Sequence, residues 1–212
     1  MNRIRIVLAD EQTLLREALA KLLEPDFDVV ATCADGRELL EVAPSLAPDA
    51  VVLDVGMPLL NGLVAGERLL RLIPGVRLVY LTASLDPSLA AEALGIGASA
   101  YVLKTCAGSE LAGAIRGALC GRTYVAPRVA DGISSAFVRT GAYARRPVRL
   151  TARQREVLQL LAEGRLMKEV AAILKITPRT VAFHKYAMMD ELQIKSNAEL
   201  IKYAITSAAV SV

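Results

Sequence analysis

Charged and polar side chains follow four short apolar runs in the first half of this 212-residue chain. Asp10 and Glu11 come after IRIVLA, Asp54 comes after AVVL, Thr82 ends RLVYLT, and Lys104 comes after AYVL. Clustered carboxylates repel one another unless a cation lies between them, and a set of oxygen ligands suits Mg²⁺. A carboxylate can also act as a nucleophile and form an aspartyl-phosphate, with Mg²⁺ and a lysine neutralising the phosphoryl oxygens.

The sequence around these residues alternates between β-branched runs and amphipathic stretches. The runs lie at residues 4–9, 27–33, 50–55, 77–82 and 100–104, and the stretches at 11–23, 36–46, 62–73, 87–97 and 109–121. This alternation predicts βα units on a parallel sheet, and continuous apolar runs fit a sheet covered on both faces. We therefore expect an α/β fold with a five-stranded, doubly wound parallel sheet. Ligands of such sheets collect at the carboxyl ends of the strands, where the polar side chains fall.

The pattern changes after residue 121. Residues 122–147 contain scattered glycines, prolines and arginines, which predicts a linker with a short helix near Val129–Phe137. From residue 148 to 212 the sequence is helical: Thr151 and Gln154 form a capping box, and Thr177-Pro178 is an N-cap and N1 pair. Four short helices with brief turns predict a small all-α domain with helix-turn-helix packing.

The net charge of +3 is unevenly distributed along the chain. Residues 1–144 carry 13 basic and 16 acidic groups, a net charge of −3, and residues 145–212 carry 12 and 6, a net charge of +6. The basic part favours a polyanionic partner. No apolar run reaches the ~18 residues of a membrane span or suits a signal peptide, so we expect a cytoplasmic protein without a membrane partner. The three cysteines lack CxxC spacing and are expected to be reduced thiols.

The stretch at residues 178–190 has two distinct helical faces. One face carries Val181, His184, Met188 and Leu192, and the other carries Arg179, Ala182, Phe183 and Tyr186. The first set is a core face. Outward aromatic side chains in a basic domain indicate contact with nucleic acid, and the alternative is a buried patch at a domain or dimer contact. The single histidine has no histidine or nearby cysteine as a partner, so we expect it to be structural and assign no catalytic residue.

Four separated stretches of the sequence, which carry five elements in order, resemble the receiver domains of response regulators. VVLDVGMPLLNG resembles their phosphoacceptor segment, VLADEQ their acidic pair, and LTAS and AYVLKT their switch and lysine segments. The resemblance covers residues 3–121 and implies phosphorylation of Asp54 by a sensor histidine kinase. It implies Mg²⁺ ligation by Glu11, Asp54 and the carbonyl of Gly56, with Asp10 acting mostly through water. It also implies the following roles: Thr82 and Tyr101 as the switch pair, and Lys104 as the salt-bridge partner of the phosphate. Glu11 departs from the aspartate common at its position.

Residues 148–206 resemble the LuxR-type helix-turn-helix output domain. The matching elements are LTxRxxEVL, the AxG turn, KEVA, TPRTV and the closing NAEL. The resemblance implies base-facing positions at Ala182, Phe183 and Tyr186. It implies phosphate or groove contacts at Arg179, Lys185, Lys195 and Asn197, and more loosely at Arg153, Arg155 and Lys168. A basic residue is frequent at position 182, so Ala182 shifts the expected readout toward apolar contact with thymine methyl groups.

Together the two halves resemble the NarL/FixJ class of response regulators. We expect a receiver at residues 1–121, a linker at 122–147 and a DNA-binding domain at 148–212. Phosphorylation would switch the output domain, and a homodimer would read half-sites about one DNA turn apart. The alternative is a phosphorylation-independent regulator that uses its receiver as an interaction platform.

Two further alternatives come from other classes of protein. An aspartyl-phosphate phosphatase also uses an aspartate nucleophile and Mg²⁺, but it would need a substrate-capping insertion and would not need the basic bundle. A small-ligand sensor would need an apolar pocket, and the acidic rim has no signature of one. We therefore expect a regulator rather than an enzyme.

Overall fold

The computed structural model describes residues 3–133 and 150–206. Its first part contains a parallel sheet of six strands in the order β2-β1-β3-β4-β5-β6. The strands are β1 (Arg5–Ala9), β2 (Asp28–Cys33), β3 (Ala50–Leu53), β4 (Arg77–Thr82), β5 (Ala100–Leu103) and β6 (Tyr124–Val125). The five predicted strands are confirmed, and the two-residue β6 extends the sheet from within the residues predicted as a linker.

Five helices cover both faces of this sheet. They are α1 (Thr13–Leu23), α2 (Gly36–Leu46), α3 (Gly62–Leu72), α4 (Pro87–Ile96) and α5 (Gly108–Leu119). Alternate strand residues point to opposite faces. Val7, Val51 and Tyr80 pack with α2, α3 and α4, whereas Ile6 and Val52 pack with α1 and α5. The predicted doubly wound arrangement is therefore confirmed, with one buried core on each face.

Local sequence signals fix where several of these helices begin. The Asp35 carboxylate accepts hydrogen bonds from the backbone N–H groups of Arg37 and Glu38 at the start of α2. Asp86 does the same for Ser88 at the start of α4, where Pro87 occupies the first turn. These caps satisfy N–H groups that have no partner within the helix. They hold the loops at the carboxyl ends of the strands in defined positions.

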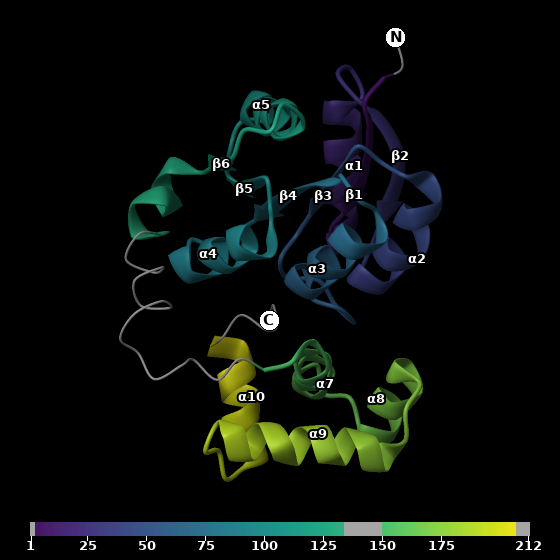
Figure 1. Cartoon of the computed structure of the whole chain (residues 1–212), viewed down its shortest axis with the longest axis vertical. Helices are drawn as coiled ribbons and strands as arrows, with labels where there is room; N and C mark the ends of the chain where they lie inside the picture. The colour runs from purple at the N-terminus through teal and green to yellow at the C-terminus, as the bar shows by residue number, and fades with distance from the viewer. Residues whose placement is uncertain (1–2, 134–149, 207–212) are drawn as a thin grey trace.

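The second part of the chain is a bundle of four described helices. They are α7 (Ala152–Ala162), α8 (Met167–Leu174), α9 (Pro178–Glu191) and α10 (Asn197–Thr206). Val157, Val170 and Val181 lie in its core, and the capping box of Thr151 and Gln154 is present. Figure 1 shows α7 facing the sheet domain and α9 on the far side of the bundle.

The connection between the two parts is only partly described. Residues 127–133 are helical, which agrees with the beginning of the predicted short helix. The rest of that helix and most of the predicted linker fall in residues 134–149, outside the described residues. Within the described parts, no helix has the length and apolar character needed to cross a membrane.

Candidate functional site

Three predicted site residues meet at the carboxyl ends of β1, β3 and β5. The Nζ atom of Lys104 lies 2.7 Å from Oδ2 of Asp10 and 2.7 Å from Oδ2 of Asp54. Both carboxyl groups are buried, with residue exposures of 3% for Asp10 and 7% for Asp54. The ammonium group therefore bridges two carboxylates that would otherwise repel each other.

The charges of this cluster influence one another. Burial raises the pKa of the Asp54 carboxyl, and the hydrogen bond and charge of Lys104 oppose that rise. Burial acts to lower the pKa of Lys104, but hydrogen bonds to Asp10 and Asp54 outweigh burial and raise it. Glu11 is exposed as a whole residue, but its carboxyl group loses part of its solvation and lies near the charge of Asp54. Both effects raise the pKa of Glu11. Lys104 thus carries its positive charge where negative charge is concentrated.

The two buried aspartates are also held by the backbone. Gln12 N–H donates to Oδ1 of Asp10 at 2.9 Å, and Gly56 N–H donates to Oδ1 of Asp54 at 3.3 Å. In the described part of the chain, no three His, Cys, Asp or Glu side chains are arranged to hold a metal ion. Mg²⁺ usually takes one or two protein carboxylates and keeps several waters. A pair of adjacent buried aspartates beside the exposed Glu11 therefore fits that ion, although it does not form a complete cage.

The loop from Asp54 to Asn61, which we call the β3–α3 loop, is tightly packed. A Cβ atom on Gly62 would lie 1.9 Å from the carbonyl oxygen of Asp54, so glycine is required where α3 begins. Asn61 caps α3 by accepting a hydrogen bond of 2.8 Å from Leu63 N–H. Gly62 N–H donates to Val55 O at 2.9 Å. The backbone of Asp54 is therefore packed directly against the start of α3.

The predicted switch pair lies along the neighbouring strands. Thr82, at the end of β4, is 4% exposed, and its Oγ1 accepts a hydrogen bond of 3.2 Å from Ser84 N–H. Tyr101 on β5 is fully buried, and its hydroxyl donates to Ser84 O at 3.2 Å. Burial raises the pKa of Tyr101 to about 12, which keeps the phenol neutral and able to donate. Both side chains thus contact one residue of the β4–α4 loop.

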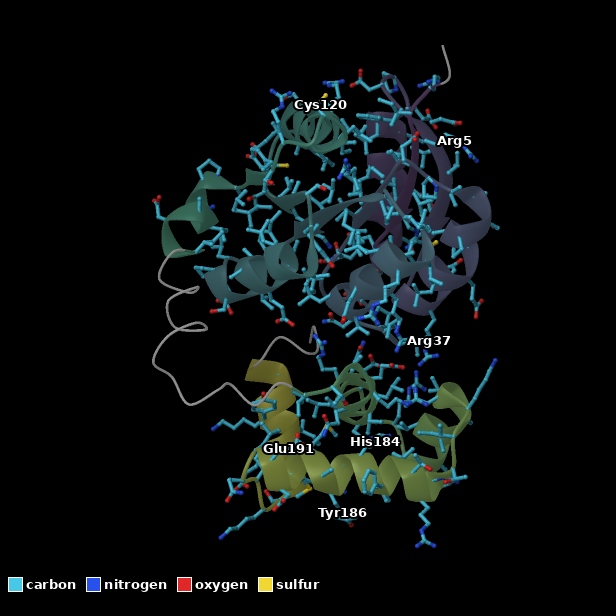
Figure 2. All side chains as sticks on the ribbon, in the orientation of Figure 1. Arg5, Arg37, Cys120, His184, Tyr186 and Glu191 are labelled. Carbon is cyan, nitrogen blue, oxygen red and sulfur yellow. The ribbon has the colours of Figure 1, made fainter. Side chains whose placement is uncertain are left out.

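The predicted outward face of α9 is exposed. Phe183 is 69% exposed and Tyr186 is 61% exposed, whereas Val181 and Met188 are fully buried. In Figure 2, Tyr186 lies on the side of α9 that faces away from the sheet domain. Such exposure of two neighbouring aromatic side chains leaves a surface available to a partner.

The remaining residues predicted at this surface take different positions. Arg179, Lys195 and Asn197 are exposed, and Ala182 is half-buried. Lys185 is only 9% exposed, and its Nζ lies 5.4 Å from the centre of the Tyr186 ring. Of the predicted contacts, Lys185 is therefore the one whose stem packs into the bundle.

His184 lies between the two faces of α9. It is half-buried rather than part of the closed core, and its ring meets the edge of Phe183 with centroids 5.7 Å apart. No histidine or cysteine partner accompanies it in the sequence. Its contacts are those of a packing residue that supports the exposed aromatic face.

A second set of polar residues joins the two domains and was not predicted. Gln159 on α7 is 2% exposed; its Nε2 donates to Met57 O at 2.7 Å, and its Oε1 accepts from Asn61 N–H at 2.7 Å. Glu163 accepts a hydrogen bond of 3.1 Å from Leu59 N–H. Two side chains of the helical domain thus bind three backbone groups of the β3–α3 loop.

Beside these bonds lies a buried charge cluster around Glu156. Glu156 is 1% exposed, hydrogen bonds to Arg68, and lies 3.6 Å from Arg37 and 3.2 Å from Arg153. Figure 2 shows Arg37 at the boundary between the two domains. The sequence does contain a pattern for this face of α7. Glu156, Gln159 and Glu163 follow one another at steps of three and four, which places them on one side of the helix. A polar stripe of this kind normally indicates a helix face exposed to solvent, so the sequence alone does not predict a domain interface here.

Two family models match the chain, one on each domain. Residues 6–116 match the response regulator receiver domain, and residues 148–204 match the bacterial regulatory proteins of the luxR family. The first match covers the strands from β1 to β5 with the acidic cluster, and the second runs from the residues before α7 into α10.

The similarity to known proteins extends over nearly the whole chain. The transcriptional regulatory protein LiaR of Bacillus subtilis is 32% identical over 203 residues, covering 95% of this chain and 96% of LiaR. The transcriptional regulatory protein UhpA of Escherichia coli is 33% identical over 201 residues, covering 94% of this chain and 96% of UhpA. The solved structure of the RcsB response regulator of Salmonella typhimurium aligns with a TM-score of 0.68 and 25% identity, covering 98% of this chain and 99% of that one.

Proposed function

Because this chain belongs to the response regulators of the NarL/FixJ class, with a receiver domain and a LuxR-type output domain, we propose that phosphorylation of Asp54 controls its binding to DNA. The observation that carries the proposal is the bridge of Lys104 between Asp10 and Asp54 at the carboxyl ends of the strands. We take the receiver as residues 1–121, the linker as 122–147 and the DNA-binding domain as 148–212. The linker then contributes β6 to the sheet of the receiver.

The receiver chemistry follows from the positions of its side chains. A carboxylate oxygen of Asp54 attacks the phosphoryl group of a phosphohistidine on a sensor kinase, and the P–O bond forms as the P–N bond breaks. Lys104 remains beside the acceptor and neutralises a phosphoryl oxygen. Glu11, Asp54 and the Gly56 carbonyl would hold Mg²⁺, with Asp10 acting through water, and the bound ion would neutralise the remaining phosphoryl oxygens.

The switch follows from the shared contact at Ser84. The Thr82 hydroxyl accepts a hydrogen bond from Ser84 N–H, and its own O–H can donate to an oxygen of the new phosphoryl group. Movement of Thr82 toward that group would draw it away from Ser84, shift the β4–α4 loop and free the Tyr101 hydroxyl from Ser84 O. Rearrangement of these two side chains alters the surface formed by α4, β5 and α5 and favours a homodimer.

The output domain is proposed to read double-stranded DNA with α9. Its exposed aromatic face would lie in the major groove, with Phe183 and Tyr186 toward the bases. Arg179, Lys195 and Asn197 would contact the phosphates, together with the ammonium end of Lys185. Two copies would read half-sites about one turn apart. Because DNA is its partner, we propose that the protein acts in the cytoplasm.

The test of this function compares DNA binding with and without phosphorylation. DNA fragments bound by the phosphorylated chain are first recovered by in vitro selection. A mobility-shift titration then measures the affinity of the full chain for such a fragment, with Mg²⁺ and with or without acetyl phosphate. We expect tighter binding with acetyl phosphate. Equal affinity under both conditions supports the rival, a phosphorylation-independent regulator with constitutive DNA binding.

Two substitutions on α9 should affect DNA binding in different ways. Tyr186→Ala removes an exposed aromatic anchor, and we expect a loss of ~1 kcal/mol or more, about fivefold in affinity. Arg179→Ala removes a phosphate contact, so the slope of log affinity against log salt should become shallower by about 1. Salt titrations of both variants on the selected fragment measure the two effects. Unchanged affinity and slope in both would show that this face has another partner.

A further inference from the structure

The outward side of α9 offers few hydrogen-bonding groups to a base edge. Arg179 is exposed in the first turn, Ala182 and Phe183 follow it, and Tyr186 lies about one turn further on. Residues 178–191 contain no asparagine or glutamine, the side chains that pair with adenine through two hydrogen bonds. Among Ala182, Phe183 and Tyr186, only the Tyr186 side chain can form a hydrogen bond. The middle of this face therefore suits apolar contact.

The surroundings of this apolar face are positively charged. Residues 145–212 carry a net charge of +6, and Arg179 and Lys195 are exposed. Figure 1 shows α9 on the side of the bundle away from the receiver, where a partner can reach it. A basic surface favours a polyanion, and the major groove of DNA combines flanking phosphates with thymine methyl groups on the base edges. Both the charge and the apolar character of this face therefore fit duplex DNA.

The two exposed aromatic rings of α9 have different neighbours. The Nζ atom of Lys185 lies over the ring of Tyr186, 5.4 Å from its centre, in a cation–π contact. That ammonium is proposed to meet a DNA phosphate, so Tyr186 lies beside the path of the DNA backbone. Phe183 instead meets the ring of His184 edge to face, and it remains 69% exposed. Phe183 therefore has the larger apolar surface available for a base edge.

His184 supports the Phe183 ring from the inner side of the helix. It is half-buried and lies one turn from each of the buried residues Val181 and Met188. The two rings are 5.7 Å apart with an angle of 69° between their planes, an arrangement that aromatic pairs favour. Ala182 adds only a methyl group beside them. A ring held in one orientation loses less freedom when it binds.

We propose that Phe183 is a specificity-determining residue that contacts the C5-methyl group of a thymine in the major groove. Among the four bases only thymine presents a methyl group there, and contact with a phenyl ring removes that group from water. The operator is then distinguished by the positions of its thymine methyl groups more than by hydrogen bonds to its bases. This inference rests on the proposed binding of DNA by α9.

Exchange of thymine for deoxyuridine tests the contact, because it removes the methyl group and keeps every hydrogen-bonding atom of the base. Each thymine of a DNA fragment selected by the phosphorylated chain is exchanged in turn. Fluorescence anisotropy titrations at fixed salt give the affinity of the full chain with Mg²⁺ and acetyl phosphate. At one thymine or more of a half-site, we expect the exchange to weaken binding by the wild type about fourfold, the effect of one buried methyl group.

Two substitutions of Phe183 connect that effect to this ring. Phe183→Ala should bind the fragment more weakly, and its affinities for thymine and deoxyuridine at the responding position should become equal. Phe183→Leu keeps an apolar side chain and should retain part of the difference. Phe183 is exposed, so neither variant removes a residue from the core of the bundle. An undiminished difference in Phe183→Ala would overturn the inference.

The neighbouring aromatic residue provides the matched control. Tyr186→Ala should lower the affinity for the fragment but keep the fourfold preference for thymine over deoxyuridine. Loss of that preference in Tyr186→Ala, with its retention in Phe183→Ala, would assign the methyl contact to Tyr186 instead. A second probe restores the methyl group on another base. Where the responding thymine is changed to cytosine, 5-methylcytosine should be bound about fourfold more tightly than cytosine by the wild type.

These measurements separate the reading of methyl groups from the proposed function. If acetyl phosphate tightens binding to the selected fragment but no exchange for deoxyuridine weakens it, the inference fails and the proposed function stands. If binding is equal with and without acetyl phosphate, but Phe183→Ala removes an effect of deoxyuridine, the inference stands and the phosphorylation switch fails. If selection returns no DNA that the chain binds, both fail.

Discussion

Replacing Asp54 by asparagine will abolish phosphoryl transfer to the chain. The amide oxygen of asparagine is a far weaker nucleophile than a carboxylate and loses its ion pair with Lys104, which now lies 2.7 Å away. Intact-protein mass spectrometry after incubation with acetyl phosphate and Mg²⁺ measures the effect. We expect one added phosphoryl group on the wild type and none on Asp54→Asn.

A control for this result lies away from the cluster. Asp26 pairs with Arg116 at 3.0 Å, and its side chain is 45% exposed. Asp26→Asn makes the same chemical change to a carboxylate, and it should be labelled like the wild type. If Asp54→Asn were labelled as strongly as the wild type, Asp54 would not be the phosphoacceptor.

Replacing Glu156 by alanine will separate the two domains. The variant leaves the guanidinium groups of Arg37, Arg68 and Arg153 facing one another at the interface. Breaking a buried ion pair costs ~3–5 kcal/mol, and we expect about 3 kcal/mol because Arg37 and Arg68 are partly exposed. The ratio of docked to separated molecules should then fall about a hundredfold. Small-angle X-ray scattering should record a larger radius of gyration.

Another charge at the same interface provides the comparison. Glu92 accepts a hydrogen bond of 2.9 Å from Arg155, and its side chain is 46% exposed. An exposed ion pair contributes ~0–1 kcal/mol, so Glu92→Ala should leave the radius of gyration unchanged. Equal scattering from Glu156→Ala and the wild type would mean that packing, and not this charge cluster, holds the domains together.

The receiver was predicted more completely than the interface because its signals are local. The β-branched runs and capping residues fixed the five main strands to within a few residues, and parallel strands place their carboxyl ends on one rim. That geometry brings Asp10, Asp54 and Lys104 together, as observed. The strand β6 was missed because two residues, Tyr124 and Val125, carry too little pattern to be recognised.

The interface was missed because its partners are far apart in sequence. Glu156 and Arg68 are 88 positions apart, and Gln159 and Met57 are 102 apart. A glutamate or a glutamine on a helix is ordinarily solvated, and nothing near it in the sequence indicates burial. The resemblance to the LuxR-type domain implied a phosphate or groove contact for Lys185. Its long apolar stem packs inward and carries the ammonium beside Tyr186.

The hydrogen bonds from Gln159 and Glu163 to the β3–α3 loop join two parts of one chain, and this has a consequence for how the protein responds to its own abundance. A tethered module meets its binding surface at an effective concentration that can reach the millimolar range. Docking is then independent of the number of molecules in the cell, whereas pairing of two copies on DNA increases with it. The docked arrangement is therefore a property of each single molecule, whereas the extent of pairing depends on how much protein is present.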